Sequence, residues 1–381
     1  MRRTPLSTLL AAGLLTWVAG PAAAAPPGVP LGLPEVPIPA DNPQTPEKIA
    51  LGDKLFHDVR FSSTGEVSCA TCHAREKVFT DSPLQVSEGI HKLTGTRNAP
   101  TVVNAAYLTS QFWDGRSPSL EDQALHPFLN PVEMGLTDHQ PILDIVRKDP
   151  EYVKQFERVF GKKGDAITIK EVVAAIASFE RVQVSGNSPF DRWRYGGEEA
   201  ALTEQQKRGF DLFVNEGRCV TCHVVEETQA LFTDNRFHNI GVGITAIQDQ
   251  IPALAQEFLK ADATASEVDA KVLTDARTSE LGRFVVDHSF DGLGAFKTPT
   301  LRNVAQTAPY MHDGSLESLH DVMIHYNNGG VSSVKDRVND FLSGGIRPLN
   351  LTDEQIDDLV AFLESLTSPE FAPKGSTGGN R

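Results

Sequence analysis

The sequence predicts a mainly α-helical protein built from two related domains, with long loops and few short strands. Amphipathic runs that begin at helix-capping residues recur along the chain, whereas the alternating pattern of strands is rare. The motif C-x-x-C-H occurs twice, 150 residues apart, and each copy follows a similar helical run. A chain of 381 residues is long enough for two domains with cores of their own. We therefore expect an internal duplication of one small helical unit.

The first 25 residues have the composition of a secretory signal peptide. Arg2 and Arg3 give a basic start, an apolar run covers 9–19, and the alanines at 22–25 offer a cleavage site. The run is too short to span a bilayer as a helix, so cleavage is favoured over the alternative of a membrane anchor. We expect a periplasmic protein with no membrane anchor after cleavage.

The mature chain divides into a leader, two domains and a tail. Residues 26–46 are rich in proline and predict an extended leader. We place an N-terminal domain at 47–197, a C-terminal domain at 198–370 and a flexible tail at 371–381.

Helices are expected after the N-capping residues Thr45, Thr203 and Thr352. The Ala- and acid-rich segment 245–280 favours a pair of surface helices, with a partner contact as the alternative. Besides the helices that begin after Thr45 and Thr203, helices are expected at 138–160, 168–183, 251–273, 315–327 and 352–366.

The net charge of the chain is −15 at pH 7. An acidic surface disfavours nucleic acid and anionic membranes as partners. It remains compatible with a protein partner that carries a basic patch.

All four cysteines belong to the two C-x-x-C-H motifs. Two thiols at this spacing can form thioethers to one haem, and the histidine that follows can bind the iron as proximal ligand. The alternative is a zinc site, but zinc needs four ligands that converge on one ion, and each motif has its own histidine. The motifs therefore predict two cytochrome c-like domains, each with a covalently bound haem c. The attachment residues are Cys69, Cys72, His73, Cys219, Cys222 and His223.

Several longer segments resemble one known family, the bacterial dihaem cytochrome c peroxidases and MauG. The resemblance covers essentially the whole mature chain, and it implies that the N-terminal haem reacts with hydrogen peroxide while the C-terminal haem stores oxidising equivalents. The segments that carry it are CATCH, GTRNAPTVVNA, QFWDGRSPSLEDQALHPFLNPVEMG, CVTCH, NRFHNIGV and FKTPTLRNVAQTAPYMHDGSLESLHDV.

The resemblance also implies roles for individual residues. Gln123, Pro127 and Glu133 match the peroxide pocket, where a carboxylate can move a proton between the two peroxide oxygens. Trp113 matches a tryptophan that relays charge between the haems.

A calcium ion between the domains is a further implication of the resemblance. Asn98, Thr307 and Pro309 match the positions that hold it in the family. Calcium prefers oxygen ligands, which amide side chains and backbone carbonyls provide.

The sixth ligand of the C-terminal haem separates subgroups of the family. Ordinary cytochrome c peroxidases have a methionine twelve residues after the glycine of an H-x-G segment, and here that position is Tyr326. This resembles the tyrosine-ligated MauG/MbnH-like subgroup. Met323, one helical turn earlier, is the alternative ligand.

The sequence departs from the family pattern at two positions, which bear on the protein substrate and on the ligands of the first haem. MauG has a surface tryptophan two residues before the second attachment cysteine, and Gly217 stands there in this chain, so methylamine dehydrogenase is disfavoured as substrate. His91 lies near the position of a displaceable distal histidine but out of register, so its ligation of the first haem stays open.

Three functions compete on these grounds. The leading hypothesis is a peroxide-using enzyme that oxidises a protein partner, with a tryptophan of that partner as the candidate target. The second is a conventional cytochrome c peroxidase that takes electrons from a small cytochrome or cupredoxin. The third is a non-enzymatic electron carrier in which both irons are six-coordinate.

Overall fold

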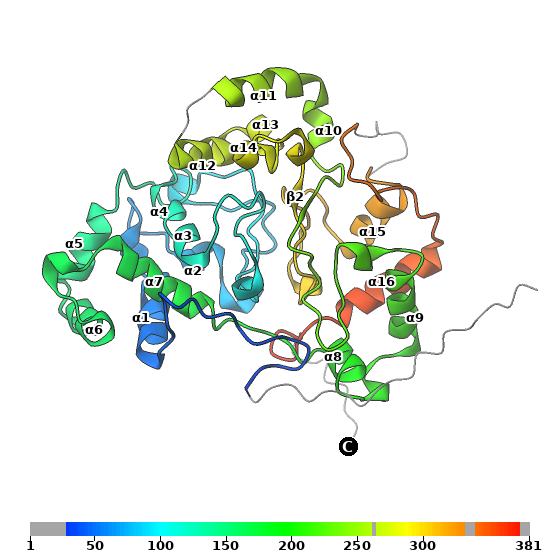
Figure 1. The fold of residues 1–381 in the computed structure, drawn as a ribbon, viewed down its shortest axis with the longest axis horizontal. Helices are drawn as coiled ribbons and strands as arrows, with labels where there is room; N and C mark the ends of the chain where they lie inside the picture. The colour runs from blue at the N-terminus through cyan, green and yellow to red at the C-terminus, as the bar shows by residue number, and fades with distance from the viewer. Residues whose placement is uncertain (1–27, 261–263, 332–339, 374–381) are drawn as a thin grey trace, which may run out of the picture.

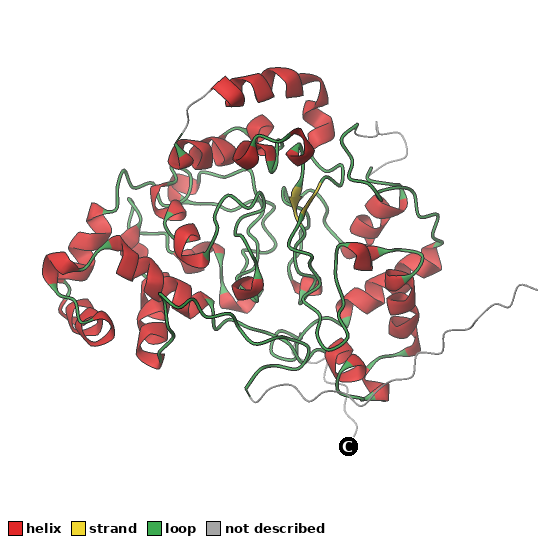
Figure 2. Cartoon of the chain, in the orientation of Figure 1, coloured by secondary structure: helices red, strands yellow, loops and turns green. Residues whose placement is uncertain are grey.

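The computed structural model describes residues 28–260, 264–331 and 340–373. Figure 1 shows two helical lobes side by side, with a group of helices from α10 to α14 above their junction. Helices and long loops make up almost all of the described chain (Figure 2). Its strands are β1 (Phe237–His238) and β2 (Phe296–Lys297), which pair antiparallel. The prediction of a mainly α-helical fold is confirmed.

The N-terminal lobe is built on one helix crossing. Helix α1 (Pro46–Phe56) begins at the predicted N-cap Thr45, whose hydroxyl accepts a hydrogen bond from the amide of Lys48. It packs on α7 (Ile169–Glu180), and both helices contribute to a core against which Cys69 and Ala70 of the first C-x-x-C-H motif pack. The remaining helices of this lobe are α2 (Cys69–Cys72), α3 (Leu120–Gln123), α4 (His126–Leu129), α5 (Gln140–Lys148) and α6 (Pro150–Phe160).

The single helix predicted at 138–160 is wrong. Two helices occupy this segment, and they meet at Asp149. Pro150 has no amide hydrogen to continue α5, but its fixed φ suits the first turn of a new helix, and the Asp149 side chain caps that helix.

The C-terminal lobe repeats the same crossing. Helix α9 (Glu204–Val214) begins at Thr203 and packs on α16 (Asp353–Glu364), which begins at Thr352. Both caps are reciprocal boxes, as the sequence predicts for the second. The other helices of this lobe are α8 (Pro189–Arg194) and α15 (Leu319–Asn327).

A glycine lets the two helices approach at each crossing. A Cβ atom added to Gly52 of α1 would lie 1.9 Å from the carbonyl oxygen of Ala175, and one added to Gly209 of α9 would lie 1.9 Å from that of Asp358. A glycine occupies the helix crossing before each C-x-x-C-H motif, and this similarity supports the predicted duplication.

The segment 245–280 is not a surface pair that stands apart. Instead of one helix over 251–273, it forms two, which pack in a third core cluster together with the helices that follow. Val132 of the N-terminal lobe packs against this cluster. The helices of the group are α10 (Ile244–Ile247), α11 (Ile251–Lys260), α12 (Ala265–Thr274), α13 (Ala276–Ser279) and α14 (Phe284–Asp287).

The described part of the proline-rich leader, 28–46, crosses both lobes as an extended strap, which Figure 1 shows in dark blue. At one end, Leu31 packs against the C-terminal core, and the Gly32 carbonyl accepts a hydrogen bond from Arg302 at 2.7 Å. At the other end, Asn42 donates to Glu121 at 2.7 Å in the N-terminal lobe. The strap thereby ties the lobes together.

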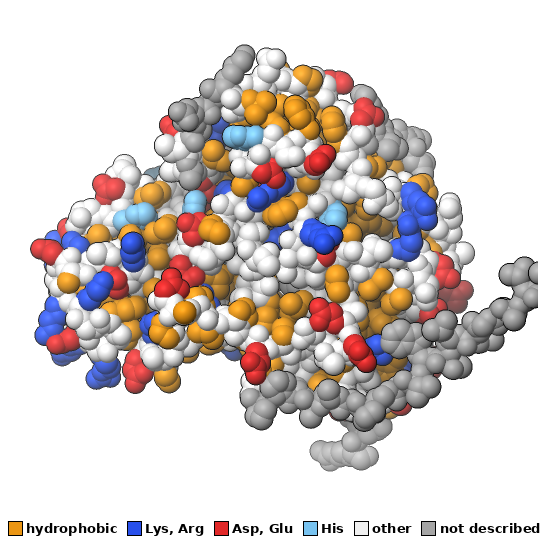
Figure 3. All heavy atoms as spheres, in the orientation of Figure 1, with side chains coloured by type: hydrophobic (Ala, Val, Ile, Leu, Met, Phe, Trp, Pro, Cys, Tyr) orange, Lys and Arg blue, Asp and Glu red, His pale blue; other side chains and the backbone are white. Residues whose placement is uncertain are grey.

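The predicted signal peptide, 1–25, lies outside the described residues, and so do 374–381 of the predicted tail. Phe371, at the start of that tail, packs against the N-terminal core. Within the described ranges, no helix is both long and apolar enough to cross a membrane. On the face drawn in Figure 3, acidic and basic side chains are interspersed.

Candidate active site

The first C-x-x-C-H motif opens onto a cavity of about 150 Å³ in the N-terminal lobe. Ser68 and Thr71 form a reciprocal cap that fixes the start of α2, so that Cys69, Cys72 and His73 all line this cavity. The Nδ1 atom of His73 lies 3.1 Å from the Phe79 carbonyl oxygen, which favours a proton on Nδ1 and leaves Nε2 for a metal.

The second motif has the same local geometry. His223 Nδ1 lies 2.8 Å from the carbonyl oxygen of Phe232, and Cys219, Cys222 and His223 line a larger cavity of about 560 Å³. Burial lowers the pKa of both His73 and His223, so each imidazole is neutral, as iron ligation requires. Paired thiols, a neutral histidine and an apolar cavity fit one haem c at each motif.

The three residues predicted for the peroxide pocket line the first cavity together with His73. Gln123 ends α3, Pro127 lies in α4, and Glu133 follows in the next loop. Burial raises the pKa of Glu133 to about 8, the charge of Asp269 adds to this shift, and Arg116 opposes it. Glu133 is therefore poised to hold or release a proton near neutral pH.

A cluster of buried charged side chains lies near Glu133, and the sequence did not predict it. Arg116 lines the cavity and pairs with Asp114 at 3.0 Å and with Asp269 at 2.8 Å. Leu273, one turn beyond Asp269 on α12, also lines the cavity. Arg116 belongs to the FWDGR segment, which the sequence already singles out. Nothing in the residues of α12 themselves predicts that this helix contacts a site so distant in the sequence.

Trp113 lines both cavities, as expected of a residue between two haems. Its indole nitrogen donates a hydrogen bond to the Asn98 carbonyl at 2.9 Å, and its own carbonyl accepts one from the Lys297 amide at 2.7 Å. Contacts from both lobes thus fix the indole ring and its backbone.

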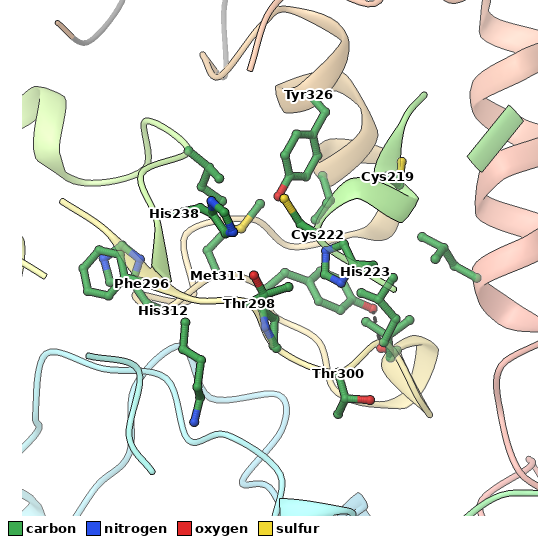
Figure 4. Close-up of a pocket in the computed structure, with 18 of the residues that line it drawn as sticks. Cys219, Cys222, His223, His238, Phe296, Thr298, Thr300, Met311, His312 and Tyr326 are labelled. Carbon is green, nitrogen blue, oxygen red and sulfur yellow. Dashed lines mark hydrogen bonds between the residues drawn. The ribbon is translucent and has the colours of Figure 1, made fainter. Parts of the chain in front are cut away.

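Both candidate sixth ligands of the second haem lie on α15 and line the second cavity. Figure 4 shows the hydroxyl end of Tyr326 pointing toward Cys222 and His223. Burial raises the pKa of the Tyr326 phenol, so a phenolate there requires a metal to offset its charge. Met323 is 8% exposed and belongs to the surrounding apolar core.

The three residues predicted to hold calcium all line the second cavity. The side-chain amide of Asn98 donates to the carbonyls of Leu84 at 3.4 Å and Gln85 at 3.1 Å. These bonds use the amide nitrogen and leave the side-chain oxygen of Asn98 as a possible metal ligand. This oxygen-rich donor set fits the ligand preference of calcium.

The remaining histidines differ in their relation to the cavities. His91 is exposed and is not among the residues that line the first cavity. His238 and His312 line the second cavity, where His238 pairs with Asp234 and His312 with Glu280, each at 2.8 Å.

Comparisons with known proteins identify the relatives of this chain. The family described as "Di-haem cytochrome c peroxidase" matches residues 46–200. The methylamine utilization protein MauG of Methylorubrum extorquens is 37% identical over 339 residues, which cover 88% of this chain and 83% of that protein. A cytochrome c peroxidase of Denitromonas iodatirespirans is 36% identical over 90% of this chain and 87% of its own length.

A solved structure gives the same result. The crystal structure of a MauG-like protein associated with microbial copper homeostasis superposes with a TM-score of 0.73 and 31% identity, covering 92% of this chain and 98% of that one. Family membership implies two haem c groups, in agreement with the two cavities described above. The chain belongs to the di-haem cytochrome c peroxidase and MauG family, and it is a haem enzyme that acts on hydrogen peroxide.

Proposed function

We propose that this enzyme uses hydrogen peroxide, bound in the N-terminal cavity, to oxidise a protein partner at long range in the periplasm. When bound, the two haems supply the redox chemistry, one as the peroxide-reactive centre and the other as a store of oxidising equivalents. The observation that carries the proposal is the shared cavity: Glu133, Gln123 and Pro127 line it together with His73, and Trp113 lines this cavity and the next.

Three residues of the cavity have different roles in the reaction of the peroxide. Glu133 takes a proton from one peroxide oxygen and returns it to the other, which then leaves as water. The Gln123 amide hydrogen-bonds the peroxide oxygens, and Pro127 contributes an apolar wall that cannot bind iron. Two electrons and two protons complete the conversion of hydrogen peroxide to two waters, and the protein partner supplies the electrons.

Trp113 serves as the charge relay between the two cavities. An indole is oxidisable, and its position in both walls supports this role. The hydrogen bond to Asn98 holds the ring in place during transfer.

The identity of the ligand on α15 determines which partner is oxidised. If Tyr326 binds the second haem, its oxygen would lower the reduction potential of that haem and favour high oxidation states, which would suit oxidation of a partner tryptophan. A methionine at position 323 suits a conventional cytochrome c peroxidase with a small cytochrome or cupredoxin as donor. The direction of the Tyr326 hydroxyl in Figure 4 supports the first.

We also propose a calcium ion held by the Asn98 side chain and the carbonyls of Thr307 and Pro309. The proposed domains are 47–197 and 198–370, after a cleaved signal peptide at 1–25, although α8, near the end of the first range, packs in the C-terminal core.

Rapid mixing of the haem-loaded protein with hydrogen peroxide tests the function. A fast spectral change followed by a long-lived oxidised state is expected for a partner-oxidising enzyme. Steady turnover of reduced cytochrome c would assign the conventional peroxidase instead. A protein that ignores peroxide, even after partial reduction, would be an electron carrier, and the proposal would fail.

A further inference from the structure

Helix α12 of the third helix group reaches the peroxide cavity from a distant part of the sequence. The Thr96 hydroxyl donates a hydrogen bond to the carbonyl of Val272 at 2.8 Å and accepts one from the hydroxyl of Ser279, at the end of α13, at 3.0 Å. Leu273 forms part of the cavity wall. These contacts hold the helix in one place against the N-terminal lobe.

Asp269, one turn earlier on the same helix, is a buried carboxylate with a partner on each oxygen. It is 3% exposed. Its Oδ1 accepts from the Nε atom of Arg116 at 2.8 Å, and its Oδ2 accepts from the side-chain amide of Asn130 at 2.8 Å. The two partners belong to two different loops of the N-terminal lobe.

The first partner belongs to the loop that carries Trp113. Arg116 binds both carboxylate oxygens of Asp114, the neighbour of Trp113, at 3.0 Å each. Its guanidinium also lies 3.5 Å from the ring centre of Phe112, on the other side of Trp113. The position of Arg116 therefore fixes the residues on both sides of the proposed relay.

The second partner shapes the turn that presents Glu133. The Asn130 side-chain oxygen accepts from the amide of Val132 at 3.1 Å, and the Asn130 carbonyl accepts from the amides of Glu133 at 3.2 Å and Gly135 at 2.9 Å. The Asn130 side-chain nitrogen donates to Asp269, so both polar atoms of this side chain are hydrogen-bonded.

We propose that Asp269 is a positioning residue of the peroxide site: its carboxylate couples the Trp113 loop, 111–117, to the Glu133 loop, 130–135. The inference deepens the proposed function and rests on it, because it assigns the two loops to one reaction. The third helix group is thus part of the active-site wall.

The charges around this pair of acids set the expected pH dependence. Asp269 is faced by Arg116 and, at 3.6 Å, by His126, which also lies 3.5 Å from Asp122. Glu133 feels the negative charge of Asp269 and the positive charge of Arg116. Removing the Asp269 charge leaves Arg116 to favour the ionised form of Glu133.

The test compares Asp269→Ala and Asp269→Asn with the wild type, all haem-loaded. The alanine variant loses both contacts, so we expect the second-order rate constant for hydrogen peroxide to fall about 100-fold through misplacement of the reacting groups. Amide hydrogen exchange is expected to speed up in 111–117 and 130–135. The asparagine variant removes the charge, and the pH midpoint of the rate constant is expected to move to lower pH.

The matched control is Glu257→Gln, which removes a surface carboxylate from α11 whose partner is Lys271. It is expected to change neither the exchange of the two loops nor the pH midpoint. In a Glu133→Gln background, Asp269→Asn is expected to have little further effect on the rate, because both changes act on the same proton transfer.

Loop exchange that stays unchanged in Asp269→Ala would overturn the inference, and so would an unchanged pH midpoint in Asp269→Asn, while a wild type that reacts with peroxide would leave the proposed function standing. If the wild type ignores peroxide, the proposed function fails, and loop exchange alone decides whether Asp269 couples the loops. If Asp269→Ala does not fold, the asparagine variant decides the question.

Discussion

Glu133 is a partly buried carboxyl group beside the negative charge of Asp269. Burial raises its pKa to about 8. Below that pH the group is protonated and cannot accept a proton from peroxide, so the rate constant for hydrogen peroxide is expected to rise with pH to a midpoint near 8. Stopped-flow measurements from pH 6 to 9 check this expectation.

Glu133→Gln removes the proton acceptor and keeps the shape of the side chain. The rate constant for peroxide is expected to fall by about 10²–10⁴ and to lose its pH dependence, in line with the usual contribution of general acid–base catalysis. Glu151→Gln, at an exposed surface ion pair, is the control and is expected to match the wild type. A Glu133→Gln variant with the wild-type rate would remove Glu133 from the mechanism.

Tyr326 and Met323 can be separated by spectroscopy without any activity measurement. If Tyr326 is the sixth ligand, Tyr326→Phe alters the low-spin signal in the electron paramagnetic resonance spectrum of the ferric protein, and Met323→Leu leaves it in place. The reverse pattern would assign the methionine and, with it, the conventional peroxidase.

At the scale of residues, sequence reasoning succeeds where chemistry is local. Each C-x-x-C-H motif carries two thiols and a histidine within five positions. Their spacing alone therefore predicts that the three side chains of a motif line the same cavity. Asp269 could not be found this way, because its partners Arg116 and Asn130 lie more than a hundred residues earlier and an aspartate in an acid-rich helix is usually solvated.

The two helix crossings give an element-scale prediction. Gly52→Ala and Gly209→Ala each place a methyl group 1.9 Å from a backbone oxygen, so the helices must separate. Each variant is expected to lower the free energy of unfolding by about 1–3 kcal/mol through overpacking. Urea titration measures the loss. Helix propensity alone would stabilise by about 1 kcal/mol, so a stabilised variant would contradict the close crossing.

Helix starts were predictable because capping chemistry is written in a few adjacent residues. Thr45, Thr203 and Thr352 all cap the helices expected after them. The break at Asp149 was missed because the hydrophobic period continues across Pro150, so the apolar pattern outweighed the proline in the prediction.

On the scale of the whole molecule, Arg302 joins the strap to the C-terminal lobe. It is fully buried, binds Asp191 at 2.8 and 2.9 Å, and donates to the carbonyls of Gly32 and Ala230. Arg302→Met leaves Asp191 buried without its partner, and we expect a loss of about 3–5 kcal/mol in the free energy of unfolding.

Limited proteolysis and urea titration check this expectation, since the strap should become a cleavage site in Arg302→Met. The control is Arg192→Ala, whose ion pair with Glu198 is on the surface. That variant is expected to change stability by less than about 1 kcal/mol. Equal effects of the two variants would argue against a structural role for the strap contact.

The proposed calcium site joins the lobes through backbone oxygens. Removal of calcium with EGTA is expected to lower the melting temperature, and added Ca²⁺ but not Mg²⁺ is expected to restore it, because the proposed carbonyl ligands suit the larger ion. Asn98→Ala should be insensitive to both treatments. A melting temperature that EGTA leaves unchanged in the wild type would exclude a calcium ion that stabilises the junction.

The arrangement of α12 also limits how such a protein can change in evolution. The first half of the chain contains a complete haem-attachment motif, yet Leu273 of the cavity wall and Asp269, which binds Asn130, come from the second half. A front half expressed alone would lose Leu273 from its cavity wall and the Asp269 contacts to Arg116 and Asn130. If the two haem domains arose by duplication, as the sequence predicts, these contacts would make each domain dependent on the other.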